Sequence, residues 1–391
     1  MFHDKFTVTV AGNDLLALII AIELALRKKK VCIIESPLET TPPLYLRDVD
    51  FLIKKLSHIG FSQFETRSYF SEPDLFQILS PEFRFDCRQT TKSLLYEFER
   101  EFDENHEPHR VSQVLKQTPI EFFKRHYVKV RKIVERQHDW TDKLSYPFSS
   151  LPYMQNFLHF QKDGAYLSAK NHEKLYKKLR DYFLKLKGTI KNTELIQIKR
   201  DFEKWTLSLK SYEGTVFTKF LVTTLPLNQI KYQKWVINRI FKRGEYLPHY
   251  IANFYLKKTK RPVGLKSYFL YMNKPQSKSL RDNVWCASIS EHKRTEQCIQ
   301  VSFFSNRPNH MANSINETLH TLIPFSKIEM GNLLERGQDF YHSFSCERKY
   351  NRAQVRLDKD WYHFGPEAGA WLGFTGQLRQ WETFKNEQIS K

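Results

Sequence analysis

Two short stretches decide the fold: residues 6–17 read FTVTVAGNDLLA, and residues 31–35 read VCIIE. The first stretch alternates threonine with apolar residues, which predicts a β-strand, and then turns through Gly-Asn-Asp. The apolar run that follows continues to Lys28 and is typical of a helix packed against a sheet. The second stretch predicts a short buried strand that ends in an acid. Together they predict a right-handed β-α-β unit with two adjacent parallel strands.

The turn of this unit has the spacing of the dinucleotide-binding fingerprint G-x-G-x-x-G. Its three small-residue positions hold Gly12, Asp14 and Ala17, and Asn13 lies between the first two. The first position allows a tight turn, the second a close approach of the pyrophosphate, and the third close packing of helix and strand. Glu35 ends the second strand at the place expected for a ribose-binding acid. These five residues are candidate cofactor-binding residues.

Asp14 replaces the second glycine of the fingerprint. Its carboxylate is expected near the helix N-terminus, where the amides and the helix dipole attract an anion. A phosphate about 5 Å away would be repelled by roughly 3 kcal/mol per charge pair at an effective dielectric near 20. The same carboxylate can cap the helix, which contributes about 1 kcal/mol. Two interpretations therefore stay open, a weakened dinucleotide site and a capped helix without a ligand.

The β-α-β unit resembles the amino end of FAD-dependent oxidoreductases, and within them the phytoene desaturase and flavin amine oxidase group. The resemblance extends to residues 76–86, FQILSPEFRFD, which are similar to a strand-turn segment of desaturase-like proteins. Residues 188–190 and 195–198, followed by residues 220–226, resemble the second crossing of the cofactor domain. In that family the residue at the position of Leu195 lies close to the adenine, which implies the same role here.

The carboxyl-terminal part of the chain carries a further resemblance. Residues 364–367, FGPE, and residues 372–376, LGFTG, resemble the closing motif of the same family. In that motif an acid meets the ribityl chain, and a glycine-opened helix start faces the flavin and the pyrophosphate. The resemblance implies five more cofactor-binding residues: Gly365, Glu367, Gly373, Phe374 and Gly376. A plain turn followed by a helix is the alternative interpretation.

The order of the expected elements predicts an α/β protein. We expect a Rossmann-like FAD-binding domain of three segments, with an inserted α+β substrate domain. The cofactor domain is expected to comprise residues 1–75, 166–228 and 346–391. The substrate domain is expected to comprise residues 76–165 and 229–345.

The resemblance implies an FAD-dependent oxidoreductase that transfers hydride from an apolar or amine substrate, with the chemistry carried by the cofactor. No residue stands out as a catalytic acid or base. Asp14 and the absence of paired glycines from residues 36–43 favour an alternative. In that alternative the chain is a non-catalytic relative that binds a protein partner or an anionic surface.

The formal net charge of +19 favours anionic partners, although a solvated basic surface explains it equally simply. Residues 231–243 could form a basic amphipathic helix at a membrane interface, or a helix that faces the core. No nucleic-acid-binding module surrounds the basic residues 110–136, so nucleic acid is not an expected partner. The dispersed cysteines and the absence of a ~20-residue apolar run predict a cytoplasmic protein without a metal site, with a membrane surface as a further contact.

Overall fold

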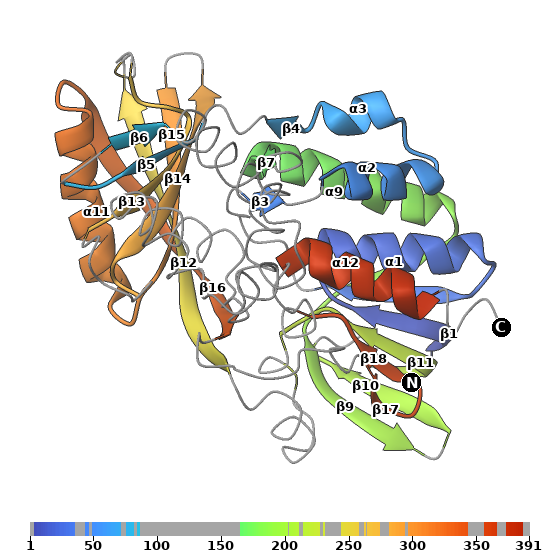
Figure 1. The fold of residues 1–391 in the computed structure, drawn as a ribbon. Coiled ribbons are helices and arrows are strands. Elements are labelled where there is room, and N and C mark those ends of the chain that lie inside the picture. Colours follow the sequence, from blue (N-terminus) through green and yellow to red (C-terminus); the bar gives the residue numbers. More distant parts are fainter. Residues whose placement is uncertain are drawn as a thin grey trace, which may run out of the picture.

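Two sheets face each other in the computed structural model (Figure 1). The possible helix at residues 231–243 and the basic residues 110–136 lie outside the described residues. The structure describes residues 4–35, 44–46, 49–71, 76–81, 84–86, 165–201, 203–210, 214–226, 230, 244–257, 262, 264–273, 281–293, 296–342, 356–365 and 373–385.

The larger sheet is built around five parallel strands in the order β18–β11–β1–β2–β8. The predicted parallel pairing of the two strands in the β-α-β unit is confirmed, with Val8 opposite Val31. Antiparallel strands complete the sheet, since β9 and β10 extend from β11, and β17 pairs with β18. The eight strands are β1 (Asp4–Ala11), β2 (Val31–Glu35), β8 (Thr189–Asn192), β9 (Leu195–Asp201), β10 (Lys204–Leu209), β11 (Thr215–Thr223), β17 (Arg356–Asp358) and β18 (Trp361–His363).

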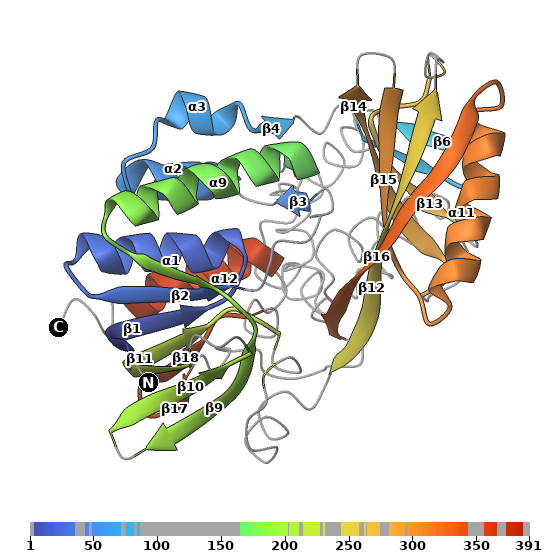
Figure 2. The same cartoon turned by 180° about the vertical axis from the view of Figure 1, so that it is seen from behind.

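Helices cover one face of this sheet (Figures 1 and 2). Every residue from Leu15 to Leu24 is buried, which explains why that helix is apolar on all sides. Strands β9, β10 and β17 belong to a second apolar cluster, where Trp205 meets Trp361 edge to face with ring centroids 5.4 Å apart. The helices are α1 (Leu15–Leu26), α2 (Val49–His58), α3 (Gln63–Arg67), α9 (Ala169–Lys185) and α12 (Gly373–Phe384).

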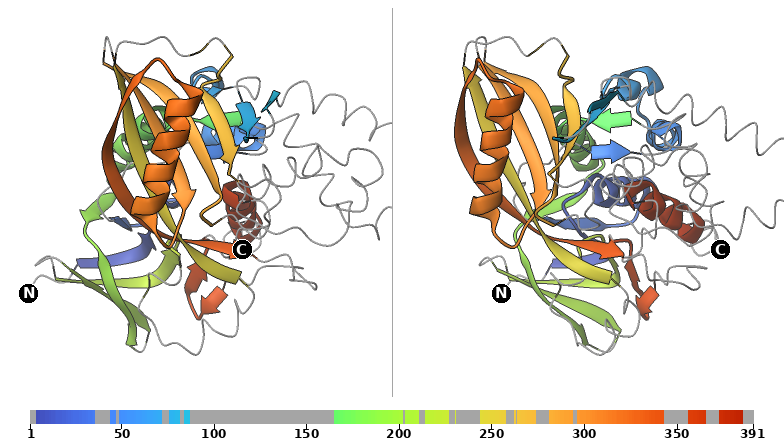
Figure 3. Two further views of the ribbon diagram at one scale, coloured as in Figure 1. Left: turned by 90° about the vertical axis from the view of Figure 1, so that its left-hand side faces the viewer. Right: turned by 60° about the vertical axis from the view of Figure 1, so that its left-hand side comes forward.

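The second sheet has the order β16–β12–β15–β14–β13–β5–β6. Helix α11 (Pro308–Leu322) covers its outer face, which Figure 3 shows from the front. Its apolar residues pack against alternate residues of the central strands. The strands are β5 (Phe76–Leu79), β6 (Arg84–Asp86), β12 (Gly244–Lys257), β13 (Tyr268–Met272), β14 (Val284–Lys293), β15 (Glu296–Phe304) and β16 (Lys327–His342).

A third, three-stranded sheet pairs β7 (Ala165–Leu167) with β3 (Leu44–Leu46) and β4 (Phe70–Ser71). The three sheets thus combine strands from distant parts of the chain. The large sheet draws on residues 4–35, 189–223 and 356–363. The domain boundaries themselves stay a prediction.

The long strand β16 was absent from the sequence prediction. It pairs with β12 over its whole length, but the register shifts twice along the way. These irregularities interrupt the alternation of side chains that identifies a strand. One of them contains Gly331, where an added Cβ would lie 2.4 Å from the ring of Tyr255. The glycine therefore serves close packing inside a strand.

Glycines follow the ends of α2 and α9, but only the first of them has a left-handed conformation. Gly60 follows α2 with φ of 101°, a conformation that favours glycine. At the end of α9, however, the left-handed residue is Lys187, with φ of 63°. Gly188 is needed for a different reason, because an added Cβ would lie 2.2 Å from the ring of Phe183.

Within the part of the chain that the structure describes, no helix combines the length and apolar character needed to cross a membrane.

Candidate dinucleotide site

The carboxyl ends of the parallel strands meet at one edge of the larger sheet. Hydrogen bonds continue past the strand ends: the Gly12 amide donates to Ile34 O at 3.0 Å, and the Thr224 amide donates to Ala11 O at 2.9 Å. Such an edge is where open α/β sheets bind ligands. The sequence predicted Gly12 and Glu35 at this edge, and the structure places both there.

Gly12 makes the tight approach for which the fingerprint needs a glycine. A Cβ at this position would lie 1.9 Å from Thr224 Oγ1 and 3.1 Å from the Cβ of Ala17. The turn therefore packs directly against the residue that follows β11 and against the first turn of α1. Ala17 is buried, and Asn13 is half-buried.

Asp14 caps helix α1. Its Oδ1 accepts a hydrogen bond from the Ala17 amide at 2.7 Å and another from the Thr224 hydroxyl at 3.1 Å. The carboxylate therefore accepts a hydrogen bond from an amide that would otherwise be available to an anion. Desolvation by burial raises the pKa of the Asp14 carboxyl to about 6, although the hydrogen bonds from Ala17 and Thr224 oppose the rise.

Glu35 is buried at the end of β2, and helix α9 supplies its partners. Arg180 Nε donates to Glu35 Oε1 at 2.9 Å, and the Tyr176 hydroxyl donates to the other oxygen. Burial, the hydrogen bond to Glu35 and its charge raise the pKa of Tyr176, so this phenol remains a donor. His172, one turn earlier, stacks on Tyr176 with ring centroids 6.1 Å apart. The acid is thus held by side chains of its own chain.

Leu195 begins β9 close to the end of β2. Thr193, two residues earlier, donates its amide to Glu35 O at 2.8 Å. The Leu195 side chain is half-buried and packs against the apolar cluster that contains Trp205. Its proposed contact with an adenine stays a prediction.

Of the five residues predicted in the carboxyl-terminal motif, Gly373, Phe374 and Gly376 lie at the start of α12, and Gly365 follows β18. Phe374 is half-buried against the cluster that contains α1. A Cβ at Gly365 would lie 2.3 Å from the ring of His363, so this glycine is required by packing. The remaining residue, Glu367, lies outside the described residues.

Sequence reasoning missed Thr224, Tyr176 and Arg180. The two α9 residues are four apart and therefore share one face of the helix. That spacing is the only local signal, and it names no partner, because Glu35 is more than 140 residues away in the chain. Thr224 follows a predicted strand, and its contact with Gly12 depends on strand order.

The side chains as placed do not fit a dinucleotide in the position typical of this fold. The Ala17 amide, which would face the pyrophosphate, is bonded to the Asp14 carboxylate. The Glu35 carboxylate, which would face the ribose, is bonded to Tyr176 and Arg180. An FAD molecule would have to displace both sets of bonds and would meet the negative charge of Asp14. We therefore assign no chemical step to a bound flavin.

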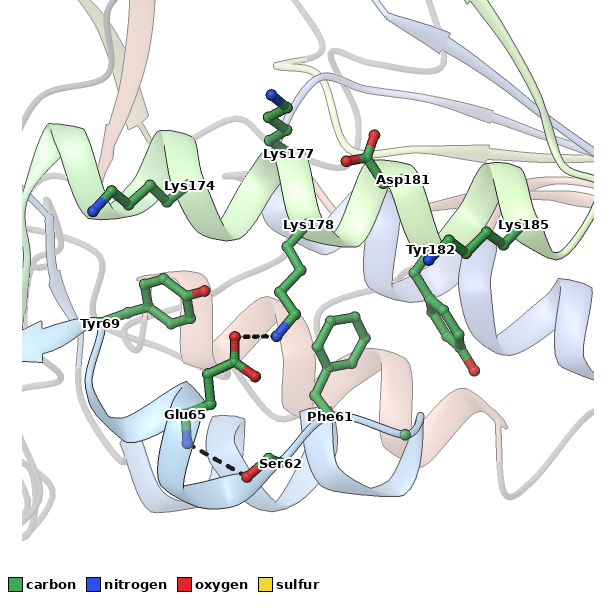
Figure 4. A pocket seen from close by; sticks show the side chains of 11 residues that line it. Phe61, Ser62, Glu65, Tyr69, Lys174, Lys177, Lys178, Asp181, Tyr182 and Lys185 are labelled. Carbon is green, nitrogen blue, oxygen red and sulfur yellow. Dashed lines mark hydrogen bonds and ion pairs between the residues drawn. The ribbon is translucent and has the colours of Figure 1, made fainter.

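A second candidate site is a groove of about 630 Å³ between α3 and α9 (Figure 4). Lys178 and Tyr182 point from α9 toward the α3 side, where Lys178 forms an ion pair with Glu65 and lies 5.5 Å from the ring centroid of Phe61. The lining contains four lysines and two carboxylates, an excess of positive charge that favours an anionic ligand. The lining residues are Gly60, Phe61, Ser62, Glu65, Tyr69, Lys174, Lys177, Lys178, Asp181, Tyr182 and Lys185.

Neither a protein-family model nor a curated protein matches the sequence. Solved structures of oxidoreductases, in contrast, share the fold along the chain. Putrescine oxidase bound to putrescine is 13% identical, with 100% of both chains covered and a TM-score of 0.62. An oxidoreductase from Methanosarcina mazei is 12% identical over 97% of this chain and 100% of the other, with a TM-score of 0.62. p-Nitrophenol 4-monooxygenase from Pseudomonas putida is 12% identical over 100% of this chain and 80% of its own, with a TM-score of 0.53.

At these identities the likeness shows the fold alone. This chain has an α/β fold with mixed sheets and covering helices, which it shares with these oxidoreductase structures and which is consistent with a flavoprotein fold. The narrower resemblance to the phytoene desaturase and flavin amine oxidase group stays a prediction.

Proposed function

We propose that this chain is an oxidoreductase-like protein of the FAD-dependent class in which Asp14 limits access to the cofactor site. The observation that carries the proposal is the bond from the Ala17 amide to the Asp14 carboxylate, at the helix end where this fold type binds phosphate. Hydride transfer from an apolar or amine substrate is the reaction that the resemblance implies for a loaded form. At neutral pH the ionised carboxylate keeps FAD binding weak.

The pH dependence of FAD binding tests this proposal. The raised pKa of Asp14, about 6, implies that about one molecule in eleven has a neutral Asp14 at pH 7 and about ten in eleven at pH 5. If FAD binds the neutral form, its affinity rises about tenfold as the pH falls from 7 to 5, because apparent affinity follows the competent fraction. Flavin fluorescence titrations at both pH values measure the change.

The control for that titration is Asp14→Asn, which keeps a capping side chain without the charge. Its FAD affinity is expected to be the same at pH 5 and pH 7. Asp14 interacts electrostatically with Tyr176, which also interacts with Glu35 and Arg180 and stacks on His172. An equal pH dependence in wild type and Asp14→Asn would assign the effect to one of these groups and refute the role of Asp14.

A non-catalytic binding protein is the second candidate function. The lysine-lined groove favours this function. So do the hydrogen bonds within the chain to the Ala17 amide and the Glu35 carboxylate, the two groups expected to bind the cofactor. We propose that the exposed lysines of α9 contact an anionic membrane surface. Each lysine near such a surface contributes about 1 kcal/mol, and salt screens the attraction.

Reversing three lysine charges tests this second candidate. The variant Lys174→Glu/Lys177→Glu/Lys185→Glu is expected to bind anionic liposomes at least 10-fold more weakly than wild type, as measured by co-sedimentation at low salt. The matched control, Lys5→Glu/Lys199→Glu/Lys204→Glu, changes the net charge equally on strands of the larger sheet. Equal loss in both variants would show that only the overall charge matters.

A further inference from the structure

A row of polar side chains crosses the inner face of the seven-stranded sheet. Ser288 on β14 stands opposite Gln300 on β15, which stands opposite Asn253 on β12. Each has apolar neighbours along its own strand that pack in the core with α11, so the row points to the opposite face. That face is turned toward the larger sheet (Figures 1 and 2). The three side chains are nevertheless buried, with exposed fractions of 4%, 6% and 7%.

Two carbonyl oxygens in this row have no hydrogen-bond partner among the residues that the structure describes. They are Asn253 Oδ1 and Gln300 Oε1, and both are buried. The first amide is oriented by a bond on its other side, because Asn253 Nδ2 donates to Asn332 Oδ1 of β16 at 2.7 Å. A buried acceptor without a donor loses its hydration and gains nothing in return, so native proteins rarely leave one. Here two such acceptors lie side by side.

The chemistry of the pair defines what could bind to it. Two acceptors require two donors, and side chains directly opposite on neighbouring strands have Cβ atoms about 5 Å apart, within reach of one small group. The row contains no carboxylate, so an ammonium group would be buried without a counter-ion at a high desolvation cost. A neutral N–H₂ group avoids that cost. Ile251, fully buried two residues before Asn253 on β12, supplies an apolar neighbour.

We propose that Asn253 and Gln300 form a binding site for a small neutral molecule that carries a primary carboxamide or urea-like N–H₂ group. The two N–H bonds of the ligand donate to Asn253 Oδ1 and Gln300 Oε1. The site lies outside the dinucleotide site and does not depend on a bound flavin. It therefore stands even if the proposed cofactor role of Asp14 fails.

Three matched probes test the site: benzamide, methyl benzoate and benzylamine. Benzamide presents the N–H₂ group, the ester has no N–H donor, and the amine is cationic near neutral pH. Benzamide is expected to bind at least tenfold more tightly than either, as measured by ligand-observed NMR and by the shift of the unfolding temperature. Equal binding of the three probes, or binding of none, would overturn the proposal and leave a bound water as the partner of the two oxygens.

Substitutions assign any benzamide binding to this pair. Asn253→Leu and Gln300→Met replace each amide by an apolar side chain of similar size, so Gln300→Met should leave the unliganded protein at least as stable as wild type. Asn253→Leu also breaks the bond to Asn332, but that amide is exposed and can bond to water instead. Each is expected to weaken benzamide binding about tenfold or more. Thr9→Val is the control, since it removes from β1 in the other sheet a buried hydroxyl that has no partner within the described part of the chain.

Asn332→Ala provides a second test that leaves both acceptors in place. It removes the partner that orients the Asn253 amide, so the preference for benzamide over methyl benzoate should fall several-fold. Unchanged benzamide binding in Asn253→Leu, Gln300→Met and Asn332→Ala would show that the probe binds elsewhere.

Discussion

Replacing Lys55 with methionine is expected to lower the free energy of unfolding by about 3 kcal/mol, measured by urea denaturation. Lys55 lies on α2 and is 3% exposed, with its ammonium 2.6 Å from Glu23 Oε1 of α1 and paired also with Glu382 of α12. Methionine keeps most of the apolar stem but removes the charge. The substitution leaves the Glu23 carboxylate buried with one cation fewer beside it. Removing one partner of a buried ion pair is costly because the remaining charge is no longer neutralised.

The surrounding network explains why the expected loss is not larger. Lys385 lies 3.4 Å from Glu23 Oε1 and 2.8 Å from Glu382 Oε1, so one cation remains. The Trp381 indole also donates to Glu23 Oε2 at 2.5 Å. Burial alone would raise the pKa of Glu382, but the hydrogen bonds from Lys385 and Lys55 outweigh it and hold that pKa below its ordinary value.

Two further variants separate charge from packing. Adding Glu23→Gln to Lys55→Met removes the uncompensated charge while keeping an acceptor for Trp381, so part of the lost stability should return. Lys210→Met breaks an exposed ion pair with Glu194 and should change stability by less than about 1 kcal/mol. An equal loss for Lys55→Met and Lys210→Met would mean that burial of the network contributes nothing.

This network also links distant parts of the chain. Helices α1, α2 and α12 meet through Glu23, Lys55 and Glu382, although more than 300 residues separate the first helix from the last. The network joins the last turns of α1 and α12 to α2, at the opposite end of α1 from Asp14.

The parts of the fold that local sequence predicts are those with local causes. The β-α-β unit follows from alternation, an apolar run and a turn within 30 residues, and Asp14 is recognisable as a capping residue by its place before the helix. The partners of Glu35 are different. Tyr176 and Arg180 reach it only because α9 packs beside α1 on the sheet, and nothing in the residues around Glu35 indicates this.

The same limit applies to the second sheet. Gln300 and Asn253 each interrupt an apolar strand, a pattern typical of any half-buried strand. Only the register shows that they are neighbours, and only the hydrogen-bond geometry shows that their two oxygens lack partners among the described side chains and backbone groups. Sequence patterns thus predict which faces are polar, whereas tertiary structure determines which polar groups could bind a ligand.

Replacing Asp14 with glycine is expected to raise FAD affinity about tenfold at pH 7. Removing a carboxylate about 5 Å from a phosphate relieves roughly 3 kcal/mol of repulsion, or about 150-fold in affinity. The observable gain is smaller, because about one wild-type molecule in eleven already has a neutral Asp14 at pH 7 when its pKa is about 6. The substitution also frees the Ala17 amide for the phosphate. Titration of both proteins with FAD by flavin fluorescence measures the difference.

The cost to the empty protein should be small, since glycine caps a helix within a few tenths of a kcal/mol of aspartate. Thr224 loses one acceptor but gains access to water or phosphate at the opened turn. A matched variant, Glu35→Gln, leaves Asp14 ionised and should not raise FAD affinity. Tight stoichiometric FAD binding by the wild-type protein at pH 7 would refute the limiting role of Asp14 and favour an active oxidoreductase. Failure of Asp14→Gly to bind FAD at all would show that the bonds from Tyr176 and Arg180 to Glu35 also keep the site closed, and would favour the non-catalytic function.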